Sequence, residues 1–141
     1  MGRIVAIDYG RKRTGIAVTD SLQMIANGLI TLPSSEVVAY LSDYVLKESV
    51  DLFVIGYPKQ MNNEPSENMQ YVKAFTTHLS RKIADIPVVY YDERFTSVMA
   101  HQAMIDGGLK KKQRQNKALV DEISAVLILQ TYLESTKYKR K

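Results

Sequence analysis

The chain has 141 residues and no cysteine, which excludes disulfide bonds, thiolate metal sites and cysteine nucleophiles. Its length suits one domain, and we expect a single domain over residues 1–141. No stretch has the length and apolarity of a membrane span, and the N-terminus lacks the charged-then-apolar plan of a signal peptide. The sequence therefore predicts a soluble, cytoplasmic protein with no membrane partner.

The formal net charge of +4 is unevenly distributed along the chain. Residues 109–141 contain nine Lys or Arg against three Asp or Glu, whereas the first 108 residues contain ten against twelve. This asymmetry favours a polyanionic partner, and nucleic acid is the leading candidate. The alternative is that the terminal basic residues only increase solubility.

Two short apolar runs joined by a basic turn open the chain. Residues 4–7 are apolar at every position and end at Asp8, and the turn leads to a second apolar run over residues 16–18. This pattern predicts a β-hairpin whose first strand is covered on both faces. A carboxylate at the end of a buried strand needs a partner. That partner is either a metal ion or a basic residue of the turn: Arg11, Lys12 or Arg13.

A third strand and the first helix follow the hairpin. Residues 25–32 form an apolar run that ends at Pro33, and Ser34 and Ser35 are candidate N-caps for a helix over residues 36–49. Residues 52–56 are again continuously apolar. They predict a buried strand that runs parallel to the first one.

The second half of the chain predicts more helices and one strand. After a loop at residues 57–64, Ser66 is the expected cap of a helix with one apolar face, formed by Met69, Val72, Phe75, Leu79 and Ile83. Residues 88–91 predict the last strand. A short helix from Thr96 or Ser97 to Gly107-Gly108 and a long helix over residues 117–135 complete the chain. This order predicts an α/β fold, a mixed five-stranded sheet flanked by helices.

Three acids stand at the ends of predicted elements: Asp8 after the first strand, Glu93 after the last strand, and Asp121 near the start of the final helix. Asp121 is unusual because it shares its helix face with apolar residues. Three converging carboxylates predict a site for one or two Mg²⁺ or Mn²⁺ ions, which could activate water for phosphodiester cleavage. The alternative is structural: Asp8 would pair with Arg11 or Arg13, Glu93 would pair with Arg94, and Asp121 would cap its helix.

Four stretches of the chain resemble one protein family: IVAIDYGRKRTGIAVTD, LFVIGYP, YYDERFTSVMA and KALVDEISAVLILQTYL. They are similar to the YqgF-type family, which is associated with nucleolytic processing of the 16S rRNA precursor and with Holliday junction resolution. The resemblance implies an RNase H-like (RuvC-like) fold. It also implies that Asp8, Glu93 and Asp121 are the catalytic, metal-binding acids, with Arg94 and Thr96 as accessory groups near the phosphate.

Basic residues beside these acids are the candidate nucleic-acid contacts. They lie in the hairpin turn (Arg11, Lys12, Arg13), after the last strand (Arg94, with Thr96), and before the final helix (Lys110, Lys111, Lys112, Arg114, Lys117). Tyr9 and Tyr57, in predicted loops beside the site, are the tyrosines expected to contact nucleic acid.

The resulting hypothesis is a metal-dependent nuclease that hydrolyses structured nucleic acid and processes the 5′ end of the 16S rRNA precursor. We expect precursor rRNA and the ribosome as partners and a monomer or weak dimer as the assembly. The alternatives are a Holliday junction resolvase, which acts on branched DNA, and a non-catalytic RNA-binding ribosome-maturation factor. An actin-like ATPase or sugar kinase fits poorly, because it would need two such domains.

Overall fold

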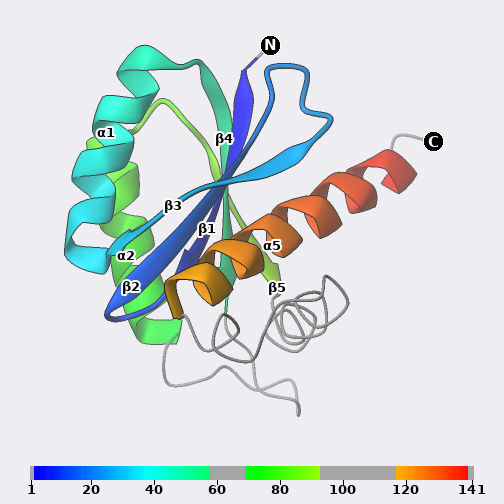
Figure 1. Ribbon diagram of the computed structural model, residues 1–141. Coiled ribbons are helices and arrows are strands. Elements are labelled where there is room, and N and C mark those ends of the chain that lie inside the picture. The colour runs from blue at the N-terminus through cyan, green and yellow to red at the C-terminus, as the bar shows by residue number, and fades with distance from the viewer. Residues whose placement is uncertain (1, 58–68, 93–116, 140–141) are drawn as a thin grey trace.

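The structure is a computed structural model that describes residues 2–57, 69–92 and 117–139. Its centre is a mixed five-stranded sheet with the strand order β3-β2-β1-β4-β5 (Figure 1). Strands β1, β2 and β3 form an antiparallel meander, and β4 and β5 continue the sheet parallel to β1. The elements are β1 (Arg3–Tyr9), β2 (Arg13–Thr19), β3 (Ala26–Pro33), the 3₁₀ helix η1 (Ser34–Glu36), α1 (Val37–Lys47), β4 (Val50–Tyr57), α2 (Met69–Lys82), β5 (Val88–Asp92) and α5 (Lys117–Lys139). The predicted sheet is confirmed.

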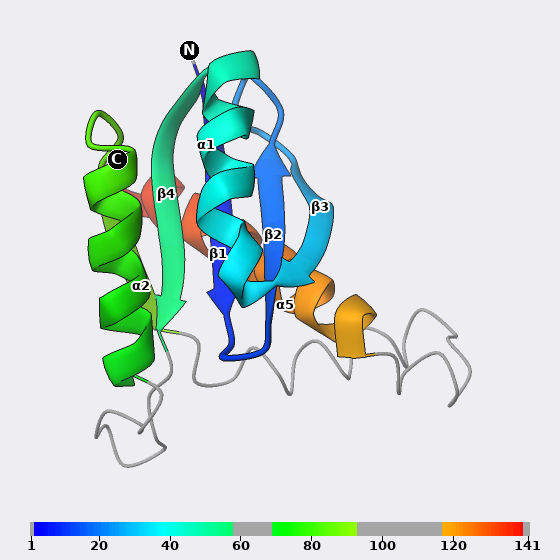
Figure 2. The ribbon, with the colours of Figure 1, turned by 90° about the vertical axis from the view of Figure 1, so that its left-hand side faces the viewer.

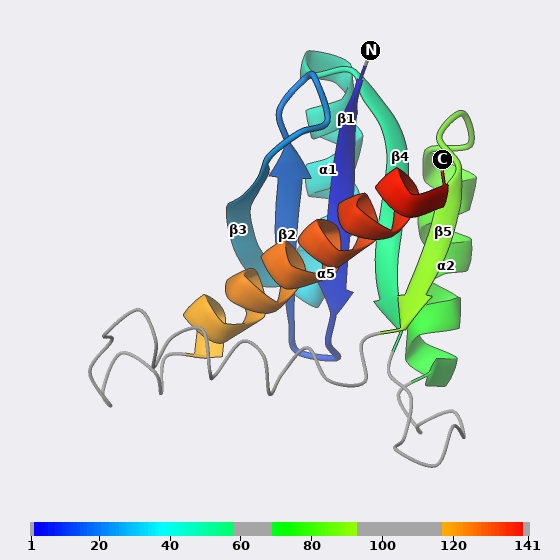
Figure 3. The ribbon, with the colours of Figure 1, turned by 90° about the vertical axis from the view of Figure 1, so that its right-hand side faces the viewer.

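The sheet is covered on both faces, so the protein has two apolar cores. Helices α1 and α2 lie side by side on one face (Figure 2), and α5 crosses the other face diagonally (Figure 3). Alternate residues of the central strands divide between the two cores, because successive side chains in a strand point to opposite faces. In β1, Val5 and Ile7 face α1 and α2, whereas Ile4 and Ala6 face α5.

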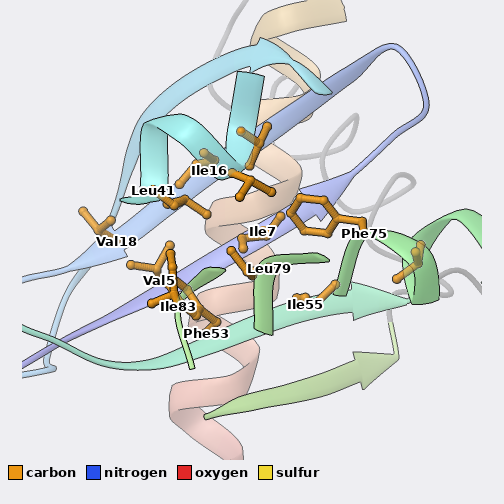
Figure 4. Packing of buried hydrophobic residues seen from close by; sticks show 13 residues of the cluster. Val5, Ile7, Ile16, Val18, Leu41, Phe53, Ile55, Phe75, Leu79 and Ile83 are labelled. Atoms are coloured by element: carbon orange, nitrogen blue, oxygen red, sulfur yellow. The ribbon is translucent and has the colours of Figure 1, made fainter. Parts of the chain in front are cut away.

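The core beneath α1 and α2 is the larger one. Figure 4 shows Phe75 and Leu79 of α2 reaching toward Ile7 of β1 and Ile55 of β4. The predicted apolar face of α2 is confirmed, since Val72, Phe75, Leu79 and Ile83 are buried and Met69 packs against them. On the other face the sheet packs against four buried residues of α5: Ala125, Ile128, Leu129 and Leu133.

The entry into α1 differs from the prediction. Ser34 and Ser35 do not cap α1; they belong to η1, and Glu36 is the N-cap residue of α1 and makes no side-chain capping hydrogen bond. The reason is that the Ser34 hydroxyl is used elsewhere, in hydrogen bonds with Gly10 and Thr14 of the β1–β2 hairpin. Helix α1 also ends at Lys47, two residues before the predicted end.

The remaining elements follow the prediction where they are described. Helix α5 extends to Lys139 and so is four residues longer than expected. The predicted cap at Ser66 and the predicted helix from Thr96 or Ser97 to Gly107-Gly108 lie outside the described residues. Within the described part of the chain, no helix is both long and apolar enough to cross a membrane.

Candidate active site

Asp8 lies at the carboxyl end of the central strand β1, where the strand leaves the core. It follows Ala6 on the α5 face of the sheet, because side chains alternate along the strand. Its side chain is half-buried rather than enclosed. Its Cα partners in the neighbouring strands are Gly15 of β2 and Gly56 of β4. Asp8 is therefore flanked on both sides by residues that have no side chain.

Gly15 brings the first turns of α5 against the sheet. A Cβ atom added at Gly15 would collide with the backbone of Asp121, at its carbonyl oxygen and carbon, and would lie 3.0 Å from the amide nitrogen of Glu122. The helix backbone thus rests directly on Gly15, whose Cα is about 5 Å from that of Asp8 in an antiparallel pair. Asp8 and Asp121, which lie far apart in the sequence, are neighbours in the fold for this reason.

Asp121 is held by an ion pair with Arg13. The Arg13 Nε atom donates a hydrogen bond of 2.9 Å to Asp121 Oδ2, and the two side chains are 39% and 24% exposed. The structural alternative, in which Asp121 caps its helix, is therefore wrong. Asp121 is the fifth residue of α5, beyond the cap position, and it uses its side chain to reach the hairpin.

The same edge of the sheet continues across β4 toward β5. Asp8 is in register with Gly56, and Gly56 is in register with Tyr91, the next-to-last residue of β5. The Tyr91 ring faces α5 and contacts Tyr132 edge-on, with 6.2 Å between the ring centroids. Adjacent strands are about 4.8 Å apart, so β5 ends about 10 Å from β1. Glu93 comes two residues after Tyr91 and lies outside the described residues.

Three contacts hold the turn between β1 and β2 in place: two hydrogen bonds from Ser34 and one ring stacking contact. Ser34 donates its hydroxyl to the Gly10 carbonyl oxygen and its amide to the Lys12 carbonyl oxygen, the latter at 3.0 Å. The Tyr9 ring stacks on Phe75 of α2, with centroids 4.6 Å apart. Tyr9 is thus the last residue of β1 and packs against a helix, which corrects its predicted place in a loop.

The three basic residues of this turn have different surroundings. Arg13 pairs with Asp121, as described above. The Arg11 guanidinium lies over the ring of Tyr71 at 4.9 Å from its centroid. Lys12, at the tip, is exposed. The turn therefore presents positive charge beside Asp8, as the sequence predicts.

Several predicted site residues lie outside the described residues: Glu93, Arg94, Thr96, Lys110, Lys111, Lys112 and Arg114. Lys117 begins α5. Tyr57 is the last residue of β4, so its predicted place in a loop is wrong. Gly15 is not among the predicted site residues, although it brings Asp121 to the sheet. A glycine inside a strand is a signal of close backbone approach, and this signal identifies the contact with α5.

The described donors fit a hard divalent cation. Asp8 and Asp121 supply carboxylate oxygens, the ligand type that Mg²⁺ and Mn²⁺ prefer, and Mg²⁺ needs only one or two protein carboxylates. Within residues 2–57, 69–92 and 117–139, no three acidic, histidine or cysteine side chains form a group that could hold a metal ion. A third protein ligand would come from outside these ranges, where the sequence predicts Glu93.

Comparison with known proteins gives consistent matches over nearly the whole chain. A family model described as "RuvX: Holliday junction resolvase" matches residues 2–135. A Parabacteroides distasonis protein named "Putative pre-16S rRNA nuclease" is 76% identical over 139 residues, which cover 99% of each chain. A Bacteroides thetaiotaomicron protein of the same name is 62% identical over 138 residues, covering 98% of this chain and 100% of the relative.

The fold matches that of a solved RuvC structure. The T. thermophilus RuvC chain in complex with a Holliday junction substrate superposes with a TM-score of 0.58, covering 97% of this chain and 96% of that chain. The two sequences are only 15% identical. RuvC has an RNase H-like fold, so the predicted fold class is confirmed.

Proposed function

The chain belongs to the RuvX family, and on this premise we propose that it is a metal-dependent nuclease that hydrolyses phosphodiester bonds in the 16S rRNA precursor. The substrate is taken from the names of the full-length relatives. The RuvC-like sheet supports the reaction class. Cytoplasmic localisation and a contact with the ribosome remain predictions from the sequence.

One observation carries the proposal: the fold brings Asp8 and Asp121 together at the carboxyl end of β1. Two acids side by side repel each other, and a shared divalent cation would relieve this repulsion. Arg13 pairs with Asp121 and offsets part of this repulsion. Asp8 is half-buried at the edge of the sheet where β1 and β4 end, so its carboxylate is not sealed in the core.

In this proposal Asp8, Asp121 and Glu93 hold one or two Mg²⁺ or Mn²⁺ ions. When bound, the cation would supply an activated water and would neutralise charge that develops on the phosphate. Arg13 keeps the Asp121 carboxylate against the hairpin through its 2.9 Å hydrogen bond. The exposed basic turn attracts and orients the phosphate backbone, together with Arg94, Thr96 and the basic residues at positions 110–112, 114 and 117.

A second candidate function is cleavage of a four-way DNA junction. The description of the family model as a Holliday junction resolvase favours it. A resolvase that cuts two strands symmetrically would act as a dimer with two equivalent sites.

The test is to incubate end-labelled precursor rRNA and a four-way DNA junction, in parallel, with wild type and Asp8→Asn in Mg²⁺, Mn²⁺ or EDTA. We expect RNA cleavage by wild type in either metal and at least a hundredfold less by Asp8→Asn, since the asparagine provides one neutral ligand in place of a carboxylate. Cleavage of the junction alone would favour the second candidate. If RNA binds in EDTA but neither substrate is cut, the nuclease proposal fails and a non-catalytic RNA-binding role replaces it.

A further inference from the structure

An exposed pair of side chains, Arg11 and Tyr71, joins the basic hairpin turn to helix α2. The Arg11 guanidinium carbon lies 4.9 Å above the centre of the Tyr71 ring. Tyr71 is 39% exposed although it is a large aromatic residue, and Arg11 is exposed as well. An exposed cation–π contact stabilises a fold only slightly. Stability therefore does not account for this pair.

The hairpin turn does not need the pair to stay in place. Tyr9 already stacks on Phe75, and Ser34 already binds the backbone of Gly10 and Lys12. Phe75 lies one helical turn beyond Tyr71, so the two rings are neighbours on the surface of α2. Phe75 is the buried member that anchors the hairpin, and Tyr71 is the exposed one.

The pair lies at the same end of the sheet as the two acids. Helix α2 begins at the end where β1 and β4 finish, and the β1–β2 turn reaches toward its first turn (Figure 2). Arg11 follows Asp8 by three residues, and the pair is on the α2 side of the edge, whereas Asp121 is on the α5 side. The pair and Asp8 therefore lie at the same end of the sheet, on its two sides.

We infer that Arg11 and Tyr71 form a stacking site for one unpaired nucleotide of the substrate. A guanidinium plane and an aromatic ring are the two surfaces on which proteins stack splayed-out bases. The base would lie on the outer face of the Arg11 guanidinium, and Tyr71 would support the inner face. This inference rests on the proposed function and specifies its substrate, because a base within a duplex is already stacked and cannot enter such a site.

The experiment measures binding in EDTA, so that no cleavage takes place. Fluorescence anisotropy would give the affinities of a single-stranded RNA, the same sequence as single-stranded DNA, and a blunt RNA duplex. The variants are Tyr71→Ala, Tyr71→Phe and Arg11→Lys. Tyr44→Ala is the matched control, because Tyr44 also makes a stacked contact, with Tyr40, but lies in the last turns of α1 beside Glu48.

We expect Tyr71→Ala to weaken single-strand binding about tenfold and duplex binding less than twofold. Tyr71→Phe keeps the ring and should stay within twofold of wild type. Arg11→Lys keeps the positive charge but removes the planar guanidinium group. The affinity for single-stranded RNA should therefore fall several-fold, while the salt dependence of that affinity is unchanged. Tyr44→Ala should bind as wild type does. Loss on both RNA and DNA would identify the base as the ligand, and loss on RNA alone would add a contact to the sugar.

An equal loss on single strand and duplex, a loss confined to DNA, or no loss in Tyr71→Ala and Arg11→Lys would overturn the inference. This outcome is distinct from failure of the proposed function. Metal-dependent cleavage by wild type and its loss in Asp8→Asn can both hold when Tyr71 has no part in binding.

Discussion

Replacing Gly15 by alanine should separate the two acids of the site. The added methyl group would collide with the carbonyl oxygen of Asp121 and lie 2.5 Å from its carbonyl carbon. These are backbone atoms of a long helix, which cannot rotate away as a side chain can. The first turns of α5 would therefore have to move away from β2, and Asp121 would move away from Asp8 with them.

The expected loss of stability follows from two opposing effects. Overpacking of a close contact costs about 1–3 kcal/mol. Replacing glycine by alanine in a strand recovers about 0.5–1 kcal/mol, because the unfolded chain loses conformational freedom. We therefore expect the free energy of unfolding of Gly15→Ala to fall by about 0–2.5 kcal/mol in urea titrations. Cleavage should fall further than the loss of folded protein alone would explain, because the two acids are separated.

Gly28→Ala is the matched control. A methyl group at Gly28, also beneath α5, would meet the Glu122 side chain at Cγ and Cδ, 2.8 and 2.9 Å away. This side chain is flexible and partly exposed, so it can turn aside. The control should lose less than about 0.5 kcal/mol and keep its activity. Equal stability and activity in both variants would refute the reasoning that α5 rests on Gly15.

Three further predictions concern single contacts. A double-mutant cycle with Arg13→Gln and Asp121→Asn should give a coupling free energy of about 0.5–1 kcal/mol. Because the ion pair is partly exposed, added salt should reduce this coupling. A coupling free energy of zero would show that the two side chains do not stabilise each other. Hydrogen bonds from the backbone amides of Ile25 and Met24 lower the pKa of the Asp20 carboxyl below its ordinary value of 3.8. The ionised carboxylate therefore stabilises the fold above pH 3.8, and this stabilisation is lost as the pH falls through the pKa of Asp20 in the folded protein. The stability difference between wild type and Asp20→Ala should therefore be smaller at pH 3 than at pH 6, and a larger difference in acid would contradict the sign. Leu79→Ala should lower the free energy of unfolding by about 2–5 kcal/mol, since Leu79 is fully buried between α2 and the sheet, and a loss below 1 kcal/mol would show that the core relaxes around the gap.

The sheet and the position of Asp8 could be predicted because they depend on local patterns. Residues 4–7 and 52–56 are continuously apolar, and this pattern is typical of central strands that are covered on both faces. The carboxyl ends of parallel strands share one edge, so Asp8 could be assigned to that edge before the structure was known.

Contacts between distant parts of the chain could not be predicted from such patterns. The Arg13–Asp121 pair joins residues that are 108 positions apart, whereas the sequence suggested Asp8, which is close along the chain, as the acid that could pair with Arg13. Ser34 has the composition of a helix cap, but tertiary contacts divert its hydroxyl to the hairpin. The contact between Tyr71 and Arg11 has no signature in the sequence, because it depends on the position of α2 relative to the hairpin turn.

The most direct test of the central claim, that Asp8 and Asp121 act in one cation site, is Mn²⁺ binding followed by electron paramagnetic resonance. Wild type, Asp8→Asn and Asp121→Asn would be titrated, with Asp20→Asn as a control because Asp20 lies at the opposite end of the sheet. We expect wild type and the control to bind Mn²⁺ equally, and each site variant to bind at least about tenfold more weakly. Unchanged binding in both site variants would contradict the claim.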